Sequence, residues 1–285
     1  MIPSDFEFLR RLLRVRSGLA LAPEKYYLVE NRLMPVARKA GLDTLEALVA
    51  RLRRPDGEVL AAEVVEAMAT KETFFFRDRT PFLHIRDTVM PALLSARATR
   101  RQIRIWCAAC STGQEAYSLA MTLKEMESAL KGWRVEILAT DLSGEALARA
   151  AAGAYSQFEV QRGLPIQHLV RHFVQDGETW RVSPALRTMV RFQQHNLLGS
   201  FAPLGTFDLI LCRNVLIYFD TAAKQEVLRR LAEACAPDGF LLLGGAETVI
   251  GLSEAWQPLP EHHALCRPVP ATESGGLSVV RAARV

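Results

Sequence analysis

The sequence predicts an α/β protein in which a doubly wound, mostly parallel sheet follows a small all-helical unit. After Arg101 the chain contains short, continuous apolar runs, separated or followed by helix-like stretches: IRIWCAAC, VEILATD, FDLILCRN and GFLLLGG. Runs of this kind are typical of parallel strands that are buried on both faces. Before Met68, apolar residues instead recur at the three- and four-residue spacing of helices.

The helical pattern extends from Ser4 to about Met68, with breaks at Ala22-Pro23, Gly41 and Pro55-Asp56-Gly57. We therefore predict four segments: an amino-terminal helical domain (1–70), a linker that contacts the ligand (71–100), an α/β domain (101–267) and a flexible tail (268–285). Within the α/β domain, VQDGETWRV predicts a hairpin around Asp176-Gly177, followed by a further strand. We expect a small β-subdomain near 157–193.

Composition argues against several classes of function. The five cysteines are odd in number and lie mostly among apolar residues, so we expect reduced thiols and no disulfide framework. Cys107 and Cys110 form a CxxC with no second pair, and we expect no metal site. No eighteen-residue apolar run and no signal peptide is found, which predicts a cytoplasmic protein without membrane insertion. The net charge of +4 is too small to predict nucleic-acid binding.

Polar residues follow the first two predicted strands, at the edge where doubly wound folds bind ligands. Gly113 would let a ligand approach the backbone, and Glu115 would attract a cationic ligand such as S-adenosylmethionine. Asp141 ends the second strand, where an acid binds ribose hydroxyls. Two alternatives stay open: Glu115 complements a helix dipole, and Asp141 caps the following helix.

The segment FDLILCRNVLIYF places polar side chains in an apolar stretch. Burying Arg213 and Asn214 without partners is costly, so we expect them to face the ligand cleft. Tyr218 would place its ring near a sulfonium or its hydroxyl on a carboxylate, and a core aromatic is the alternative. Arg77 follows three phenylalanines, Phe74 to Phe76, and its planar fork suits a carboxylate.

In order, KETFFFRD, CAACSTGQEAYSLAM, ATDLSGEAL, HNLL, FDLILCRNVLIYFD and LLLGGAETV resemble the motifs of the chemotaxis receptor methyltransferases, the CheR family. The resemblance covers nearly the whole chain except the tail. It implies an all-helical domain before a Rossmann-like S-adenosylmethionine-dependent methyltransferase domain with a small antiparallel β-subdomain. It also implies methyl transfer from S-adenosyl-L-methionine to chemoreceptor glutamates, which gives methyl esters and S-adenosyl-L-homocysteine.

The resemblance implies a role for each matched residue. Arg77 and Tyr218 would be catalytic, with Arg77 also near the cofactor and Tyr218 near the transferring methyl group. Glu115 would bind the methionine end of the cofactor, and Asp141 its ribose. With Gly113 from the turn chemistry, the complete predicted site is Thr73, Arg77, Gly113, Glu115, Asp141, Asn196, Leu197, Arg213, Asn214 and Tyr218.

Within that set, Asn196 and Leu197 would flank the adenine, while Arg213 and Asn214 would line the floor of the site. The sequence departs from the family pattern at Lys71, where Asn is usual. Gln114 and Ala116 are further departures, beside an intact Glu115. The short hairpin VQDGETWRV also lacks the glycine-rich insertion by which some members bind a receptor pentapeptide, so we expect an anchor-independent enzyme.

The basic residues of the first predicted helix, Arg10, Arg11, Arg14 and Arg16, indicate an acidic partner, with an ordinary solvated face as the alternative. We expect them to meet the cytoplasmic helical region of chemoreceptors. Two other function classes stay open: a methyltransferase acting on nucleic acid or a small molecule, and a binding module that senses the cofactor without turnover. An RNA enzyme that attacks through cysteine would need a reactive thiol, and Cys212 ends an apolar strand instead.

Overall fold

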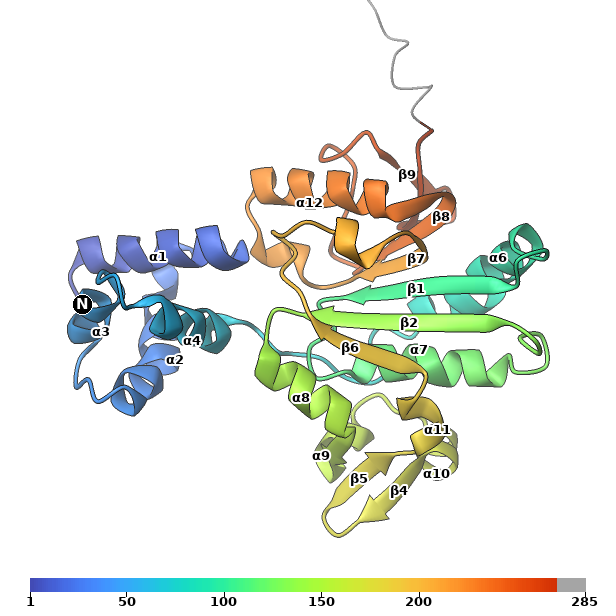
Figure 1. The fold of residues 1–285 in the computed structure, drawn as a ribbon, viewed down its shortest axis with the longest axis horizontal. Coiled ribbons are helices and arrows are strands. Elements are labelled where there is room, and N and C mark those ends of the chain that lie inside the picture. Colours follow the sequence, from blue (N-terminus) through green and yellow to red (C-terminus); the bar gives the residue numbers. More distant parts are fainter. Residues whose placement is uncertain (271–285) are drawn as a thin grey trace, which may run out of the picture.

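The computed structural model describes residues 1–270, in which a four-helix unit adjoins a larger α/β domain (Figure 1). The unit contains α1 (Pro3–Ser17), α2 (Tyr26–Lys39), α3 (Leu45–Leu52) and α4 (Glu58–Met68). Residues spaced three or four apart turn inward and form its core, and these include Leu9, Leu13, Val29, Leu33, Leu48 and Val64. The predicted all-helical unit is therefore confirmed. None of the described helices is both long and apolar enough to cross a membrane.

The α/β domain is built on a seven-stranded sheet with the order β6-β2-β1-β7-β8-β10-β9. The four predicted apolar runs form β1 (Gln102–Ala108), β2 (Arg134–Asp141), β7 (Phe207–Cys212) and β8 (Cys235–Leu243), and neighbouring members pair in parallel. At one edge β9 (Trp256–Leu259) and β10 (His262–Pro268) add antiparallel pairing. The chain turns from β2 on one side of β1 to β7 on the other, so the topological switch point lies at β1.

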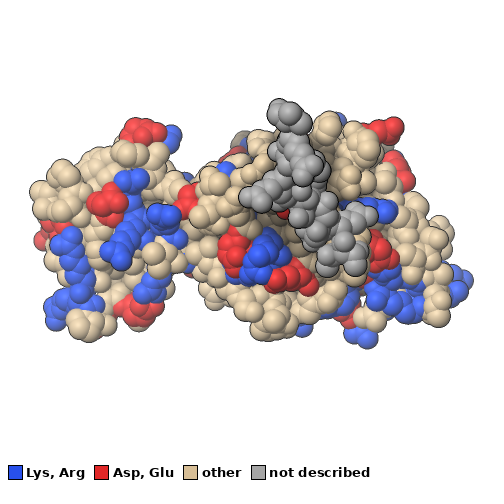
Figure 2. All heavy atoms as spheres, turned by 90° about the horizontal axis from the view of Figure 1, so that it is seen from above, with Lys and Arg blue, Asp and Glu red and all other residues tan. Residues whose placement is uncertain are grey.

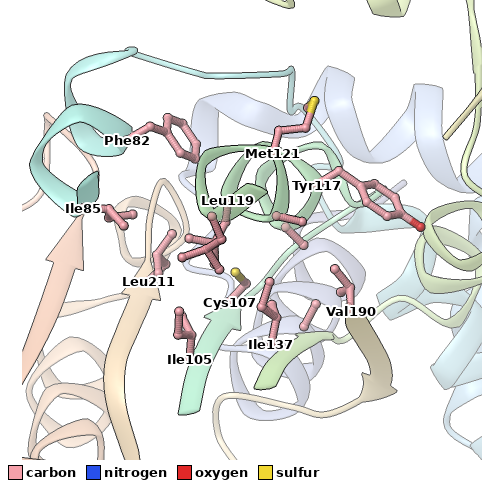
Figure 3. Close-up of a cluster of buried hydrophobic side chains, with 14 of the residues drawn as sticks. Phe82, Ile85, Ile105, Cys107, Tyr117, Leu119, Met121, Ile137, Val190 and Leu211 are labelled. Atoms are coloured by element: carbon pink, nitrogen blue, oxygen red, sulfur yellow. The ribbon is translucent and has the colours of Figure 1, made fainter. Parts of the chain in front are cut away.

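Helices cover both faces of this sheet, as continuous apolar strands require. On one face lie α5 (Thr80–His84), the π-helical turn Ile85–Val89, α6 (Met90–Ala96) and α7 (Gln114–Glu125). Ile105 and Cys107 of β1 pack beneath α7 (Figure 3), whereas Trp106 points to the opposite core, where α12 (Thr221–Ala234) supplies Val227. This alternation of side chains divides the apolar interior into two layers.

A three-stranded antiparallel sheet forms the small β-subdomain, with β3 (Ala154–Ser156), β4 (Phe173–Asp176) and β5 (Thr179–Val182) in the order β3-β5-β4. The hairpin predicted at Asp176-Gly177 joins β4 to β5. Short helices α9 (Gln157–Gln161), α10 (Ile166–His172) and α11 (Pro184–Arg187) flank it, and α8 (Gly144–Ala152) precedes it.

The expected range 157–193 needs correction at both ends. Strand β6 (Val190–Gln194) pairs with β2 in the large sheet, and β3 precedes the range. The physical reason is that the pairing partner of a strand depends on the tertiary fold. The alternation of apolar and polar residues within the strand does not indicate which strand it pairs with. The predicted tail also begins too early, because Pro268 belongs to β10; residues 271–285 lie outside the described part of the chain. The other segment boundaries stay predictions.

Candidate active site

A cavity lies at the carboxyl ends of the central strands, between the α/β domain and the helical unit. All the predicted site residues except Gly113 line it: Thr73, Arg77, Glu115, Asp141, Asn196, Leu197, Arg213, Asn214 and Tyr218. Ser17 and Leu19 form part of its wall and come from the end of α1 and the segment after it. No sequence pattern indicates this wall, because it depends on how the helical unit packs against the sheet.

The turn from β1 to α7 has an unusual backbone conformation. Ala109 (φ 59°) and Ser111 (φ 51°) line the cavity in the left-handed region, which side chains other than glycine rarely adopt. The strain is held by a backbone hydrogen bond from Cys110 N to Thr140 O (2.9 Å) and by Ser111 N, which donates to Asp141 Oδ2 (2.7 Å). The turn is thus fixed directly to the end of β2.

Close packing requires a glycine at position 113. It has φ 93°, and a Cβ atom there would lie 2.9 Å from the Cβ of Ala150 and 3.1 Å from the Tyr155 hydroxyl oxygen. The glycine therefore lets α8 and β3 approach the β1–α7 turn. Gly113 is not among the residues that line the cavity, and its approach to a ligand stays a prediction.

Glu115 opens α7 and forms an ion pair with Arg213, whose side chain is fully buried at the end of β7. Arg213 Nη1 lies 2.8 Å from Glu115 Oε2, and Arg213 Nη2 lies 2.7 Å from Asp78 Oδ2 and 3.0 Å from Arg77 O. Burial raises the pKa of Glu115, while the charge of Arg213 opposes that rise. Arg213 thus fastens the linker and α7 to β7, and both of its Nη atoms are paired, whereas its buried Nε has no hydrogen-bond partner among residues 1–270.

Asp141 accepts one backbone hydrogen bond on each carboxylate oxygen, from Ser111 N (2.7 Å) and from Ser143 N (2.9 Å). The side chain that caps α8 is Ser143, which accepts from Ala146 N (2.9 Å), so the alternative that Asp141 is the cap is wrong. Burial raises the pKa of Asp141. Each oxygen keeps a lone pair for a further donor on the cavity side.

Asn196 and Leu197 follow β6 at the border with the helical unit. The Asn196 side chain donates from Nδ2 to Arg16 O (2.7 Å) and accepts at Oδ1 from Leu198 N (2.9 Å), so its amide fastens α1 to this loop. Leu197 is buried and presents an apolar side chain to the cavity. A backbone hydrogen bond from His195 N to Asp141 O (2.9 Å) holds the loop beside the acid.

The loop after β7 carries Asn214 in the left-handed region (φ 59°). Glu247 holds this loop, because its carboxylate accepts from Asn214 N (2.7 Å), Val215 N (2.9 Å) and Gly244 N (2.8 Å). Our sequence reasoning assigned Glu247 no role. The feature of the sequence that could have identified Glu247 is an acid shortly after a Gly-Gly pair at the end of an apolar strand.

Tyr218 lies in a 3₁₀ turn that contacts the helical unit, since Ala20 N donates to Tyr218 O (2.8 Å). Its partly buried ring lines the cavity, and its hydroxyl has no hydrogen-bond partner among residues 1–270. Beside it, Arg14 Nε forms an ion pair with Asp220 Oδ2 (2.6 Å). The hydroxyl is therefore available to a ligand. In the alternative interpretation, a core tyrosine, the hydroxyl would already be hydrogen-bonded within the protein.

Arg77 and Thr73 enter the cavity from the linker. Arg77 Nη1 donates to Glu72 O (3.1 Å), and the guanidinium lies 5.6 Å from the centre of the Phe74 ring. Phe75 and Phe76 are buried in the core. The buried aromatic residues thus anchor the linker in the core, and the Arg77 guanidinium group remains at the cavity.

The site has the chemistry of a pocket for a ligand with cationic and hydroxyl groups. Three acids line the cavity: Glu72 from the linker, Glu115 and Asp141. Leu142 and Leu197 supply apolar surface. Burial raises the pKa of the Cys212 thiol well above its ordinary value, so it is protonated and a poor nucleophile at neutral pH. Within the part of the chain that the structure describes, three or more metal-ligating side chains never come together.

Comparison with known proteins gives matches along almost the whole chain. A family model described as "CheR methyltransferase, SAM binding domain" matches residues 71–264, and one described as "CheR methyltransferase, all-alpha domain" matches residues 4–68. The chain is 42% identical over 271 residues to "Chemotaxis protein methyltransferase 1" of Pseudomonas aeruginosa, covering 93% of this chain and 96% of that protein. It is 40% identical over 257 residues to "Chemotaxis protein methyltransferase Cher2" of Pseudomonas putida, covering 89% and 93%.

Proposed function

The chain belongs to the CheR methyltransferase family and uses S-adenosylmethionine, and we propose that it methylates glutamate side chains of chemoreceptors. The observation that carries this proposal is a single cavity that brings Glu115 and Asp141 together with Arg77 and Tyr218. The two acids suit the cofactor, and the arginine fork with the free hydroxyl suits a carboxylate substrate. The expected products are a glutamate methyl ester and S-adenosylhomocysteine.

We propose the following contacts for the cofactor. Asp141 accepts hydrogen bonds from the ribose hydroxyls, since both of its oxygens retain acceptor capacity. Glu115 binds the ammonium group, and its pairing with Arg213 fixes its direction. Leu197 packs against the adenine, while the Asn196 amide is already used within the protein and shapes the loop. Thr73 and Asn214 complete the wall and floor.

The reaction requires orientation more than proton transfer. S-adenosylmethionine supplies an activated methyl group whose leaving group is a neutral thioether. A glutamate side chain, with an ordinary pKa of about 4.3, is already ionised at neutral pH and needs no general base. We propose that Arg77 holds one carboxylate oxygen while Tyr218 directs the other toward the methyl group. Both residues supply rate by restricting the geometry of attack.

Transfer of labelled methyl from S-adenosylmethionine to membranes bearing the host's chemoreceptors tests this proposal. Carboxyl methyl esters release methanol in mild base, whereas N-methyl groups do not. We expect release with the unmodified protein and a strong loss with Arg77→Ala, whereas Arg229→Ala, an exposed arginine on α12, should match the unmodified protein. Cofactor binding without any methanol release would favour a sensing module or another substrate.

We also propose that α1 contributes to receptor docking. Lys and Arg side chains gather over the helical unit in the view of Figure 2. However, Arg10, Arg14 and Arg16 are each paired with an acid of this protein, namely Glu7, Asp220 and Glu58. Arg11 is exposed and has no ion pair among residues 1–270, so it is the best candidate to contact an acidic receptor helix.

The two-residue turn of the β4–β5 hairpin supports independence from a pentapeptide anchor.

A further inference from the structure

A closed ring of polar contacts links the helical unit to the cavity through Asp141. Its five members come from α4, the linker, the β1–α7 turn, the end of β2 and the start of α8. They are, in order around the ring, Glu66, Lys71, Ser111, Asp141 and Ser143.

Glu66 makes the contact between the two parts of the protein. It lies in the last turn of α4, and its carboxylate accepts from the Ser143 hydroxyl, from Glu145 N (3.1 Å) and from Gly144 N (3.3 Å). An acid is favourable at these amides, which form the amino terminus of α8. Burial alone would raise the pKa of Glu66, but the hydrogen bonds from Ser143 and Glu145 hold it below its ordinary value. The carboxylate is therefore ionised at neutral pH.

Lys71 completes the ring from the linker. Its Nζ lies 2.6 Å from Glu145 Oε2 and 3.6 Å from Glu66 Oε1, and its carbonyl oxygen accepts from the Ser111 hydroxyl (2.9 Å). Lys71 thus balances the charge of two acids and holds the strained Ser111. This is also the position at which the resemblance predicts an asparagine, which could not supply that charge.

Both hydrogen-bond donors to Asp141 are consequently held by residues outside the sheet. Ser143, which donates to Asp141 Oδ1, is fixed by Glu66, and Ser111, which donates to Asp141 Oδ2, is fixed by Lys71. If α4 moved away from α8, Ser143 would lose the support of Glu66, and Lys71, which holds Ser111, would lose its contact with Glu66 and keep only its ion pair with Glu145. The direction of the Asp141 carboxylate therefore depends on where the helical unit lies.

We propose that Glu66 is a positioning residue for cofactor binding, which it controls by locking the helical unit onto α8 and so orienting Asp141. The inference rests on the proposed ribose contact of Asp141. Under this proposal, cofactor binding and the docking of the helical unit onto α8 are thermodynamically coupled, so that each stabilises the other. Anything that shifts the helical unit, such as a receptor bound to it, should change cofactor affinity by the same coupling.

Calorimetry of S-adenosylhomocysteine binding to the full chain, without any receptor, tests the proposal. We expect Glu66→Ala to weaken affinity by about tenfold or more, because several charge-assisted hydrogen bonds are lost. Glu66→Gln should have an intermediate effect, since an amide retains one acceptor. Glu63→Gln is the matched control, because Glu63 lies on the same helix in an exposed pair with Lys39, and its affinity should be unchanged.

Wild-type affinity in Glu66→Ala would overturn the proposal. If that variant does not fold, Ser143→Ala decides instead, since it removes one link of the ring and keeps the Glu66 contacts with the α8 amides; an unchanged affinity there would overturn it equally. A purely structural role would lower the unfolding temperature and leave the affinity of the folded fraction unchanged. In the methylation assay we expect a raised KM for S-adenosylmethionine with little change in kcat. A protein that binds the cofactor but methylates no receptor would defeat the proposed function and leave this test intact.

Discussion

Arg213 Nη1 lies 2.8 Å from Glu115 Oε2, so a buried ion pair joins the ends of β7 and the β1–α7 turn beneath the cavity. Truncating one partner of such a pair leaves the other charge buried and uncompensated. We expect Arg213→Ala to lower the free energy of unfolding by about 3–5 kcal/mol, measured by urea denaturation. Arg229→Ala, which breaks exposed pairs, should cost about 1 kcal/mol or less. Equal losses in the two variants would contradict a structural role for the buried pair.

The raised pKa of Glu115 predicts opposite pH trends for stability and cofactor affinity. Because the folded-state pKa lies above the unfolded one, the contribution of Glu115 to stability is fully present below the unfolded pKa. It is lost as the pH rises through the folded pKa. The cofactor's ammonium group needs the ionised acid, so affinity should instead fall as the pH drops through the folded pKa.

Urea denaturation and calorimetry with S-adenosylhomocysteine between about pH 4 and pH 8 measure the two trends separately. Glu115→Gln should reduce both, and Asp141, whose pKa burial also raises, should account for what remains of the stability trend. An affinity that stays constant over this range, with stability still falling as the pH rises, would remove Glu115 from the ammonium site.

Gly113→Ala should destabilise the protein through packing as well as backbone strain. A methyl group at this position would lie 2.9 Å from the Cβ of Ala150, in a turn with φ 93°. Gly177 is the matched control, because its φ is 61° and a Cβ there has nothing within 4 Å. We expect Gly113→Ala to cost about 1–3 kcal/mol more than Gly177→Ala in thermal or urea unfolding. Equal costs would mean that backbone strain alone explains the glycine.

The sequence predicted the central strands well because they are buried on both faces and therefore read as continuous apolar runs. It also predicted where Asp141 and Arg213 lie, since Asp141 ends one such run and Arg213 directly follows another. Edge strands were harder to assign. The segment VRFQQ, which forms β6, lies at one edge of the sheet, and nothing in its pattern separated it from the neighbouring hairpin.

Contacts between distant parts of the chain were the main gap in the site. The Asn196 amide is used to hold α1, which lies 180 residues earlier, and no local pattern indicates this. At Gly113 the sequence does not distinguish ligand approach from close packing, because a glycine at such a turn serves both equally well. Glu247 was missed because its task is to accept backbone hydrogen bonds, which does not depend on sequence spacing.

Two guanidinium groups lie close to the Phe74 ring, which links the β-subdomain to the Arg77 side chain. The carbon at the centre of the Arg162 guanidinium is 4.5 Å from the ring centre, and the corresponding carbon of Arg77 is 5.6 Å away. Arg162 also forms an ion pair with Glu72 (2.6 Å), whose carbonyl oxygen accepts from Arg77. Next to it, a Cβ on Gly163 would clash with the carbonyl oxygen of Phe75, so the two segments pack very closely.

We therefore expect Arg162→Ala to release Phe74 and lower kcat for receptor methylation about three- to tenfold, because Arg77 loses its fixed position. The affinity for S-adenosylhomocysteine should not change, since Arg162 does not line the cavity. Arg162→Lys should recover part of the rate, because an ammonium group still attracts the ring and Glu72 but cannot stack on the ring as a planar guanidinium does. Arg181→Ala, an exposed pair with Asp176 in the same subdomain, is the control. If both alanine variants retain full kcat, the β-subdomain does not act through Phe74; if both lose it equally, the effect belongs to the subdomain's charge and not to this stack.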